Sequence, residues 1–437
     1  MQPVNTKYKK EEKKISNLRF PGFEGEWIVQ KIGDISEIIG GGTPDSTIDK
    51  YWDGEVQWFI PTELKTKYVS VSKRTITELG LRKSSAKLLP IGAILLTTRA
   101  TIGDTSIALR ECTTNQGLQS IVVNYQNCNE WVYYLINNIK KELTKRASGS
   151  TFLEISKKEL KKIRVSLPSL PEQKKIASFL SAVDQKIQHL TRKKELLELY
   201  KKGVMQKIFS QKIRFKPDGA GFGSAQPAGV GPEAKQNRVV ERSRNYPDWE
   251  EKRLGEICEM TSSKRVYLSD YVDRGIPFYR GKEISELKKN QIPSDLLYIT
   301  DERYKEFKLK YGAPVKGDIL ITAVGTLGNI FRIRNNDKFY FKDGNLIWLR
   351  NISENSEFLE FYIQYNINEL IKTSIGSTQK ALTIVELKKI KLFIPSLEEQ
   401  QKITSFLSNI DSKIESIKTQ ITQTQKFKKG LLQQMFV

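Results

Sequence analysis

The sequence contains few of the residues from which metal sites and hydrolytic active sites are built. It has a single histidine, His189, and three cysteines, Cys112, Cys128 and Cys258, none of them in a CxxC pair. A lone histidine argues against a catalytic triad and a zinc hydrolase, and the cysteine spacing argues against a disulfide scaffold. Neither a GxxxxGKS/T phosphate loop nor the Asn-Pro-Pro-aromatic tetrapeptide of adenine methyltransferases occurs. We therefore expect a chain that is not an enzyme, with no catalytic residues, no metal ligands and no cofactor of its own.

Long apolar runs and acidic charge are also scarce. No stretch approaches the roughly 20 apolar residues that a membrane span needs, and the basic N-terminus around Lys7 and Lys14 is not followed by the apolar segment of a signal peptide. We expect a cytoplasmic protein without membrane contact. The chain has 72 Lys and Arg against 50 Asp and Glu, a formal net charge of +22 and a pI near 9.6. This excess favours a nucleic-acid partner over lysines that are merely solvated.

An internal repeat organises the whole chain. The segment 168–187 returns at 395–414 after 227 residues, without a gap, and weaker echoes extend upstream through glycine and threonine turns. The repeated helical segment is nearly identical in the two copies, whereas the globular parts have diverged. Two copies that read different targets would diverge in this way. Relaxed drift is the alternative, but it does not explain why the turns match while the residues between them differ.

Each repeated segment predicts a long helix. A Ser-x-x-Glu capping box opens both, at Ser169 and Glu172 and again at Ser396 and Glu399. Apolar residues then recur at steps of four and three, which is the period of a coiled coil. The residues expected on the seam toward the partner helix are Ile176, Leu180, Val183 and Ile187 in the first copy and Ile403, Leu407, Ile410 and Ile414 in the second.

The two helices are expected to pair antiparallel, because the intervening domain must return the chain. At 1.5 Å per residue, a helix over 170–209 would be about 60 Å long, which exceeds one turn of DNA. Such a coiled coil would act as a spacer. An ordinary helical hairpin within one core is the alternative.

The globular halves read as short strands, turns and two helical stretches near 130–146 and 357–373. Glycine-bearing loops separate the strands, and polar side chains beside such loops can contact phosphates or base edges. The candidates for DNA contact are Thr43, Arg99, Thr101, Gln116 and Ser150 in the first half and Lys264, Arg265, Arg280, Lys282, Thr326, Gln379 and Lys380 in the second.

The sequence resembles the specificity subunits of type I restriction–modification systems over almost its whole length. The resemblance rests on Pro-Ser-Leu-x-Glu-Gln-x-Lys-Ile, present at 168–176 and 395–403, and on Tyr246-Pro-Asp-Trp249, Thr98-Arg-Ala-Thr-Ile-Gly103 and Lys201-Lys-Gly203. It implies two target-recognition domains, each of which reads one half of a split, asymmetric DNA sequence. It also implies helices that set the gap and dock two methyltransferase subunits, which use S-adenosylmethionine. Restriction subunits that use ATP and Mg²⁺ would complete the assembly.

The expected fold is therefore α+β, with two target-recognition domains of short strands and helices separated by an antiparallel coiled coil, in a pseudo-two-fold tandem repeat. The segments are an N-terminal arm (1–26), a first recognition domain (27–168), a central spacer helix (169–211), a linker (212–245), a second recognition domain (246–395) and a second spacer helix (396–437). The linker departs from the family pattern, because residues 216–245 are rich in Gly, Ala and Pro and read as flexible.

Two other functions compete with this interpretation. A free-standing bipartite DNA-binding protein would use the same two readers without enzyme partners. A nuclease would need the loose pattern of Pro44-Asp45 with Glu63 and Lys65, which arises easily by chance in a chain rich in Lys and Glu.

Overall fold

The computed structural model describes residues 16–99, 101–149, 153–215, 248–288, 291–325, 327–342, 344–372 and 381–436. They form two compact units. Unit 1 comprises Met1–Lys193 and Ile417–Val437, and unit 2 comprises Lys194–Ser416. Each unit therefore contains one globular half and a segment of each long helix. The predicted linker at 216–245 lies outside the described residues.

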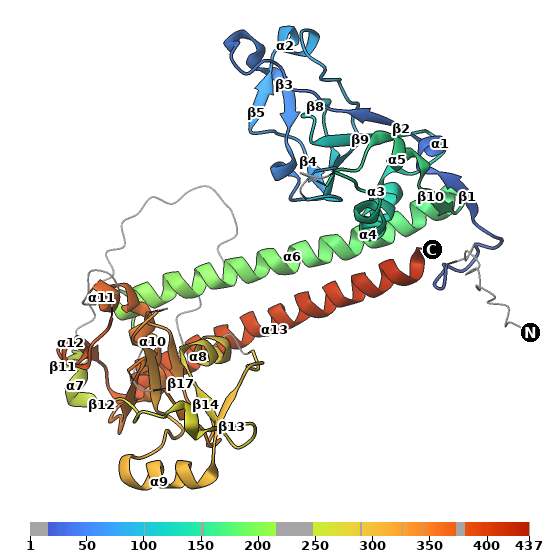
Figure 1. Ribbon diagram of the computed structural model, residues 1–437. Helices are drawn as coiled ribbons and strands as arrows, with labels where there is room; N and C mark the ends of the chain where they lie inside the picture. Colours follow the sequence, from blue (N-terminus) through green and yellow to red (C-terminus); the bar gives the residue numbers. More distant parts are fainter. Residues whose placement is uncertain are drawn as a thin grey trace, which may run out of the picture. The chain divides into compact units, whose positions relative to one another are not determined.

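The two long helices are α6 (Leu170–Phe209) and α13 (Leu397–Met435). In unit 1, the beginning of α6 shares an apolar cluster with the end of α13, and in unit 2 the end of α6 shares one with the beginning of α13. The helices thus run antiparallel, side by side (Figure 1). The coiled coil predicted from the 3.5-residue period is confirmed.

The seam residues lie in these clusters. Those of unit 1 pack with Leu431 and Met435, and those of unit 2 pack with Val204 and Ile208. The buried members are Ile176, Leu180, Val183, Ile403, Leu407 and Ile410, and the partly buried ones are Ile187 and Ile414.

Matching ion pairs fix the same helix register in both units. Asp184 of α6 contacts Lys428 of α13 at 2.6 Å, and Lys201 of α6 contacts Asp411 of α13 at 2.7 Å. Each residue of the first pair is separated from its counterpart in the second by the 227-residue repeat. The pseudo-two-fold symmetry of the sequence is therefore also a symmetry of contacts.

Unit 1 builds its globular half from two sheets and a terminal strand pair. The main sheet has the order β2-β9-β6-β7-β4, the second sheet has the order β5-β3-β8, and β1 pairs with β10. The strands are β1 (Ile28–Lys31), β2 (Ser36–Gly40), β3 (Trp52–Phe59), β4 (Tyr68–Val69), β5 (Arg74–Ile76), β6 (Ile94–Thr97), β7 (Thr105–Ala108), β8 (Cys112–Thr114), β9 (Leu118–Val123) and β10 (Arg164–Leu167).

Unit 2 repeats the main sheet and changes the second one. The main sheet has the order β12-β19-β16-β17, the second sheet has the order β13-β15-β14-β18, and β11 pairs with β20. The strands are β11 (Glu250–Arg253), β12 (Glu259–Thr261), β13 (Tyr271–Val272), β14 (Ile276–Tyr279), β15 (Leu297–Ile299), β16 (Ile319–Thr322), β17 (Ile330–Arg332), β18 (Tyr340–Phe341), β19 (Leu346–Arg350) and β20 (Lys391–Ile394).

The helices follow the same division. The helices between the main sheet and the coiled coil occur in both halves, whereas those beside the second sheet differ. The repeated helices are α1 (Ile32–Ile35), α3 (Asn129–Asn138), α4 (Lys140–Lys145) and α5 (Lys157–Lys162), matched by α7 (Leu254–Ile257), α10 (Ser356–Tyr365), α11 (Ile367–Lys372) and α12 (Ile384–Lys388). The unmatched helices are α2 (Glu78–Arg82) in unit 1 and α8 (Gly281–Lys288) and α9 (Asp301–Tyr311) in unit 2.

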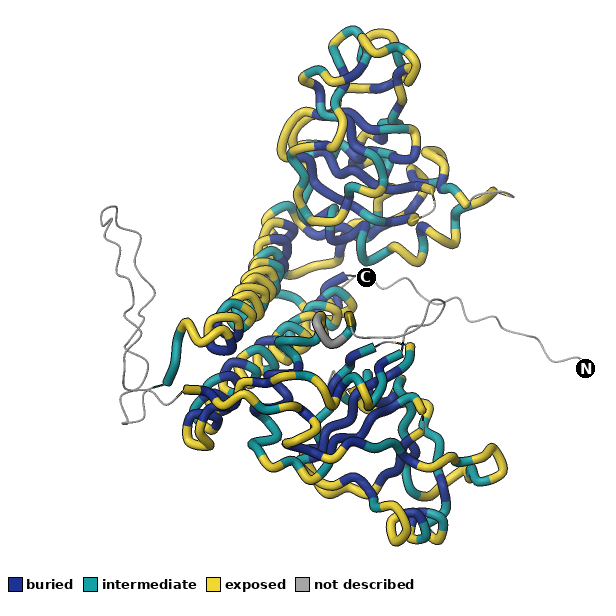
Figure 2. Tube along the Cα trace, turned by 90° about the vertical axis from the view of Figure 1, so that its left-hand side faces the viewer, coloured by how far each residue is buried: buried dark blue, intermediate teal, exposed yellow. Residues whose placement is uncertain are grey.

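The strand pairs β1–β10 and β11–β20 join the two ends of each globular half directly before a long helix. Ile28 pairs with Leu167, and Glu250 pairs with Ile394. The main-sheet strands are mostly buried, and the long helices are exposed over much of their length (Figure 2). The α+β class with two similar halves, predicted from the sequence, is confirmed. Within the described residues, no helix combines the length and the apolar character needed to cross a bilayer.

The arm before Trp27 and the tail after α6 make equivalent contacts. The Leu18 N–H donates to the carbonyl of Gln434 at 3.0 Å, and the Ile213 N–H donates to the carbonyl of Lys207 at 3.2 Å. Next along the chain, Arg19 binds Glu172 in unit 1, as Arg214 binds Glu399 in unit 2. The tail 210–215 follows α6 directly in the sequence. The N-terminal arm occupies the equivalent place at the end of α13, although it is distant from α13 in the sequence.

Candidate nucleic-acid interface

Three loops of unit 1 meet at one edge of the main sheet. Strands β2 and β6 end at this edge, whereas β9 and β7 begin there, because neighbours in the sheet are antiparallel. The loops 41–51, 98–104 and 115–117 therefore converge. The Thr98 N–H donates to the Gly117 carbonyl at 3.0 Å, and the Gly42 N–H donates to the Thr114 carbonyl at 2.8 Å.

The two glycines of the first loop are required by close packing. A Cβ atom on Gly41 would lie 2.0 Å from the Asn115 carbonyl oxygen, and one on Gly42 would lie 2.3 Å from the Ala86 nitrogen. Only glycine permits such an approach of two backbones. The packing brings together Thr43 and Gln116, whose side chains share a hydrogen bond and are both exposed.

The other two described candidates of unit 1 lie in the loop 98–104. Arg99 forms a 2.8 Å ion pair with Glu154, and its side chain remains about half exposed (47%). Thr101 is exposed in the same turn. The structure therefore gathers Thr43, Gln116, Arg99 and Thr101 at one edge, and Ser150 lies outside the described residues.

Unit 2 presents an equivalent edge with different side chains. The loop residues 262–270, 323–325, 327–329, 342 and 344–345 follow or precede β12, β16, β18 and β19 there. Lys264 and Arg265 are exposed in the first of these loops. The Lys264 ammonium lies 5.0 Å from the centroid of the Tyr311 ring. Thr326, Gln379 and Lys380 lie outside the described residues.

Arg280 directly precedes α8, and Lys282 lies in the first turn of this helix. The helix lies beside the edge, because Asn329 donates a 2.7 Å hydrogen bond to its Ser285. The Arg280 guanidinium binds Glu283 at 2.5 Å, which raises the pKa of Arg280 above its ordinary value. Lys282 is more exposed (53%) and lies 3.6 Å from Asp295. Lys282 is therefore more accessible to a phosphate than Arg280 is.

The alternative nuclease pattern does not assemble. The Asp45 carboxylate accepts hydrogen bonds from the side chain and backbone of Thr47, which lower its pKa. The Glu63 carboxylate accepts from the backbone N–H groups of Ile60 and Lys73. Both acids thus support local turns, and within the described ranges no group of three or more His, Cys, Asp or Glu side chains could hold a metal ion.

The repeated Glu-Gln of the helix starts has a structural role that the sequence patterns did not reveal. Both oxygens of Glu172 accept hydrogen bonds from Arg19, and both oxygens of Glu399 accept from Arg214. The glutamates of the two predicted capping boxes each bind an arginine. Each glutamine receives the backbone N–H at the start of a repeated helix: Gln173 from Cys128 and Gln400 from Asn355, at 2.8 and 2.9 Å. The motif thus joins each globular half to its long helix.

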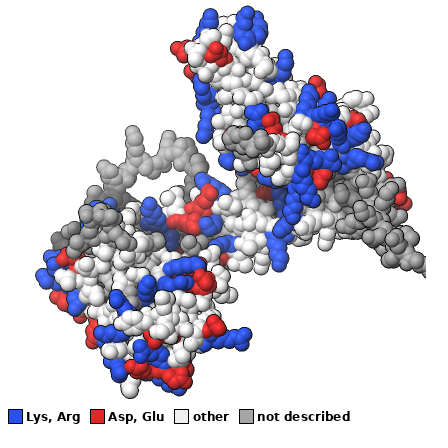
Figure 3. Space-filling model, viewed as in Figure 1, with Lys and Arg blue, Asp and Glu red and all other residues white. Residues whose placement is uncertain are grey.

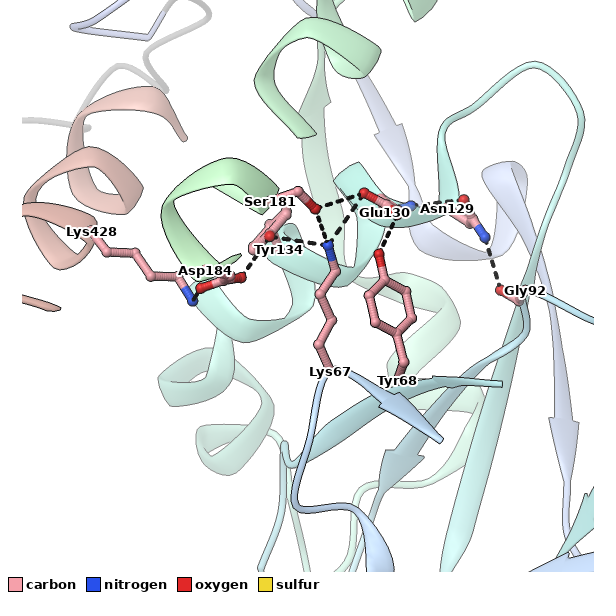
Figure 4. A network of polar contacts seen from close by, with 9 residues as sticks. All are labelled: Lys67, Tyr68, Gly92, Asn129, Glu130, Tyr134, Ser181, Asp184 and Lys428. Atoms are coloured by element: carbon pink, nitrogen blue, oxygen red, sulfur yellow. Dashed lines mark hydrogen bonds and ion pairs between the residues drawn. The ribbon is translucent and has the colours of Figure 1, made fainter. Parts of the chain in front are cut away.

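A polar network at the same junction of unit 1 also escaped sequence reasoning (Figure 4). The Lys67 ammonium donates to Glu130, Tyr134 and Ser181, and the Tyr134 hydroxyl donates to Asp184 at 2.7 Å. Asp184 in turn holds Lys428 of α13. Lys67 lies directly before β4, so the network connects this segment with helix α3 and with both long helices.

Burial shapes the chemistry of this network. It raises the pKa of the Tyr134 hydroxyl and raises the pKa of Tyr68 to about 12. Burial also opposes ionisation of Glu130, but hydrogen bonds from Tyr68, Lys67 and Ser181 and the Lys67 charge lower its pKa overall. The arrangement is a fixed polar contact rather than a reactive site, because each charged group already has a partner.

Comparison with known proteins identifies the family. The model of the type I restriction modification DNA specificity domain matches residues 24–199 and 246–425, which is most of the chain and both halves. The chain belongs to the type I specificity-subunit family. The family recognised from the repeated helix motif is confirmed. Specificity subunits are the non-catalytic DNA-recognition components of restriction–modification systems, and they act in complexes with methyltransferase and restriction subunits and with DNA.

Curated relatives include the MjaIX specificity subunit of Methanocaldococcus jannaschii, 29% identical over 421 residues, covering 93% of this chain and 92% of that protein. The EcoR124I/EcoR124II specificity subunit of Escherichia coli is 26% identical over 174 residues, covering 38% and 43% of the two chains. Among solved structures, a specificity subunit from M. genitalium matches with a TM-score of 0.56 at 17% identity, covering 97% of this specificity subunit and 99% of that chain. This likeness shows the shared fold.

Proposed function

We propose that each recognition domain of this specificity subunit reads one half of a split, asymmetric DNA target, while the paired helices set the unread gap. The observation that carries the proposal is the contrast between the repeated and the changed parts. The helices, their ion pairs and the main sheet recur in both units, whereas the loops at the sheet edge carry different polar side chains. Similar scaffolds with different loops are suited to two different half-sites.

The exposed residues at the two edges suit the chemistry of base and phosphate recognition. A glutamine such as Gln116 can form two hydrogen bonds to adenine, and an arginine such as Arg265 can form two to guanine. Lys264 and Lys282 suit phosphates, for which a point charge is enough. Lys and Arg side chains are more abundant than acidic ones on the face drawn in Figure 3, in keeping with a polyanionic partner.

The proposed assembly contains two methyltransferase subunits, because the docking helices repeat. These partners would use S-adenosylmethionine to methylate adenine, and restriction subunits would use ATP and Mg²⁺. None of these cofactors is assigned to this chain. The proposed location is the cytoplasm, where DNA and these partners are found.

Co-expression with the methyltransferase subunit in a host without adenine methylation tests the proposal. Single-molecule sequencing should then reveal N6-methyladenine on both strands of one split motif, and only when the specificity subunit is present. Gln116→Ala should relax the motif at one half-site, and Arg265→Ala should relax it at the other. Sequence-specific binding by the chain alone, with no methylation in a stable complex, would instead support a free-standing binder.

A further inference from the structure

Helices α4 and α5 of unit 1 carry more positive charge than their counterparts in unit 2. Residues 140–145 and 157–162 contain seven lysines and two glutamates. The equivalent residues 367–372 and 384–389, which follow 227 positions later in the chain, contain three lysines and two glutamates. The net charge of these residues is therefore +5 in unit 1 and +1 in unit 2, although they occupy the same places in the repeated scaffold.

The additional lysines of unit 1 stand where unit 2 has neutral residues. They are Lys140, Lys141, Lys157 and Lys158, in the places of Ile367, Asn368, Ile384 and Val385. All four lysines are exposed, whereas Ile367 and Ile384 pack against the core of unit 2. Burial of an isoleucine stabilises a fold more than exposure of a lysine does. The packing of unit 1 therefore does not account for these lysines.

The two helices lie against each other and share their acidic groups. Arg146, which follows α4, contacts Glu142 of α4 at 2.7 Å and Glu159 of α5 at 3.9 Å. A hydrogen bond from Lys162, together with the charges of Lys162, Arg146 and Lys158, lowers the pKa of Glu159. Both glutamates of these helices are thus already neutralised by neighbouring cations.

The remaining lysines form what we call the basic face. Its members are exposed and have no ion pair among the described residues: Lys141, Lys145, Lys157, Lys158 and Lys161. Lys and Arg atoms are dense in Figure 3 over the part of unit 1 where Figure 1 places α4 and α5. The two leucines of the helices, Leu143 and Leu160, are buried, so α4 and α5 offer no apolar anchor to a protein partner.

The basic face adjoins the sheet edge that carries the recognition loops of unit 1. Lys140, at the start of α4, binds Asp104 at 2.6 Å. The N–H of Ile155, just before α5, donates to the carbonyl of Thr98 at 3.2 Å. Asp104 and Thr98 both belong to the loop 98–104, so the two helices are attached to this loop. A duplex read at the edge would pass close to the basic face.

We propose that the basic face of unit 1 binds phosphates of the DNA duplex beside the half-site that unit 1 reads, and that α11 and α12 of unit 2 make no equivalent contact. The inference rests on the proposed function, because the recognition loops determine where the DNA lies. Lysine ammonium groups are point charges that bind phosphate without reading bases. The two ends of the target are therefore held unequally, and the end read by unit 1 depends more strongly on salt.

DNA binding by the co-expressed complex with the methyltransferase subunit tests the inference. The methylated motif gives the target, and its relaxation by Gln116→Ala shows which half-site unit 1 reads. Two duplexes then carry this target with about 10 additional base pairs, one turn of DNA, beyond one half-site only. The unmodified complex should bind the duplex extended beside the half-site of unit 1 more tightly, and the logarithm of its affinity should fall more steeply with the logarithm of the salt concentration.

A neutral variant removes four charges of the basic face and combines Lys141→Gln, Lys145→Gln, Lys157→Gln and Lys158→Gln. Lys140 is kept, because its ion pair with Asp104 holds the loop 98–104. Each phosphate contact contributes about 0.9 to the salt slope, so the slope should fall by about 2–4 on the first duplex and little on the second. The methylated motif should not change. The same four positions changed to arginine should keep the slope of the unmodified chain.

The reverse substitution uses unit 2. Asn368→Lys with Val385→Lys gives unit 2 the counterparts of Lys141 and Lys158 at two exposed positions. The slope should then rise by about 1–2 on the duplex extended beside the half-site of unit 2. The first duplex should be bound as before.

Each other outcome overturns a defined part of the inference. An unchanged slope of the neutral variant on both duplexes, with the motif still methylated, would overturn the phosphate contact and leave the proposed function intact. An equal fall on both duplexes would show that the lysines act only through the total charge. Loss of methyltransferase copies from the neutral variant in native mass spectrometry would assign the face to the protein partner. No methylated motif with the unmodified complex would overturn the proposed function as well.

Discussion

Position 134 in unit 1 is a tyrosine, whereas the equivalent position 361 in unit 2 is a phenylalanine. Tyr134 connects Lys67 to Asp184 through its hydroxyl. Phe361 has no hydroxyl. A lysine of the helix-to-helix ion pair lies over the ring in both units, Lys201 at 4.7 Å from the centroid of Phe361 and Lys428 at 5.6 Å from that of Tyr134. The cation–π contact is therefore common to both units, and the hydrogen bonds of the Tyr134 hydroxyl are added in unit 1.

The cation that binds the repeated glutamate also differs. Glu130 of unit 1 receives Lys67, which comes from the segment before β4, whereas Glu357 of unit 2 receives Arg332, which belongs to β17, at 2.9 Å. The serine that joins each glutamate to the long helix is retained, as Ser181 and Ser408. The comparison teaches that the serine contact between the repeated helices is kept, whereas the cation that binds the glutamate comes from a different element in each unit.

The largest expected effect is the loss of the buried glutamate at a helix start. Glu399→Ala would remove the buried carboxylate that Arg214 binds and would also remove the acceptor of the Trp249 indole N–H. We expect unit 2 to lose about 3–5 kcal/mol of unfolding free energy. Hydrogen exchange of the α10 amides measures the loss. Glu398→Ala, at an exposed neighbour, should change it little.

Glu172→Ala sharpens the same comparison. The indole N–H of Trp27 is buried and has no acceptor among the described residues, so Glu172 serves only the arm. We expect a smaller loss than for Glu399→Ala, and an equal loss would show that the Trp249 contact adds nothing.

Lys67→Met should have the next largest effect. The substitution removes the cation shared by Glu130, Tyr134 and Ser181, where the Lys67 side chain is only 12% exposed. We expect unit 1 to lose about 2 kcal/mol, measured as faster hydrogen exchange in α3. Unit 2 should be unaffected, because Arg332 supplies its cation. Equal destabilisation of α10 would contradict the separate junctions described above.

Tyr134→Phe gives unit 1 the side chain found in unit 2. It removes the hydrogen bond to Asp184 and one acceptor of Lys67, so a loss of about 1 kcal/mol is expected in unit 1. Tyr133→Phe is the matched control, since no hydrogen bond of its hydroxyl is seen. Urea unfolding and hydrogen exchange of the α3 amides measure the loss of stability in the two variants. Equal losses would contradict the linked network.

The ion pairs between the long helices should contribute least. Lys201→Met and Lys428→Met each remove one pair whose aspartate is partly exposed, so about 0.5 kcal/mol is expected at low salt and less at high salt. We expect Lys201→Met to lower the unfolding free energy more than Lys428→Met does. The Lys201 side chain is less exposed than that of Lys428, at 16% against 26%. Urea unfolding at two salt concentrations measures both.

Acid should weaken the contacts of Glu130, because the pKa of this carboxylate is lowered in the folded protein. Because the folded pKa of Glu130 lies below the ordinary value, its ionised contacts stabilise unit 1 above the ordinary value of 4.5 and are lost as the pH falls through the lowered value. We expect Glu130→Gln to abolish this part of the acid destabilisation. The measurement is hydrogen exchange of the α3 amides between about pH 3 and about pH 6. These values lie below and above the ordinary glutamate pKa.

The repeat, the long helices and their antiparallel pairing were predicted from the sequence, since heptad spacing and the near-identity of two segments 227 residues apart can be read without the fold. The helix predicted over about 170–209 is α6 (Leu170–Phe209), which begins directly after Ser169 of the predicted capping box. The family followed from the same motif. Each of these features can be inferred from local spacing or from the comparison of one segment with the other.

Tertiary structure alone decided which side chains meet. Thr43 and Gln116 come together because β2 and β9 are antiparallel neighbours and two glycines allow the backbones to approach. Lys67 reaches Glu130 and Ser181 across three elements, and Arg19 reaches Glu172 across 153 residues. Periodicity determines which face of an element is apolar, but the packing of non-local elements determines which partner that face meets.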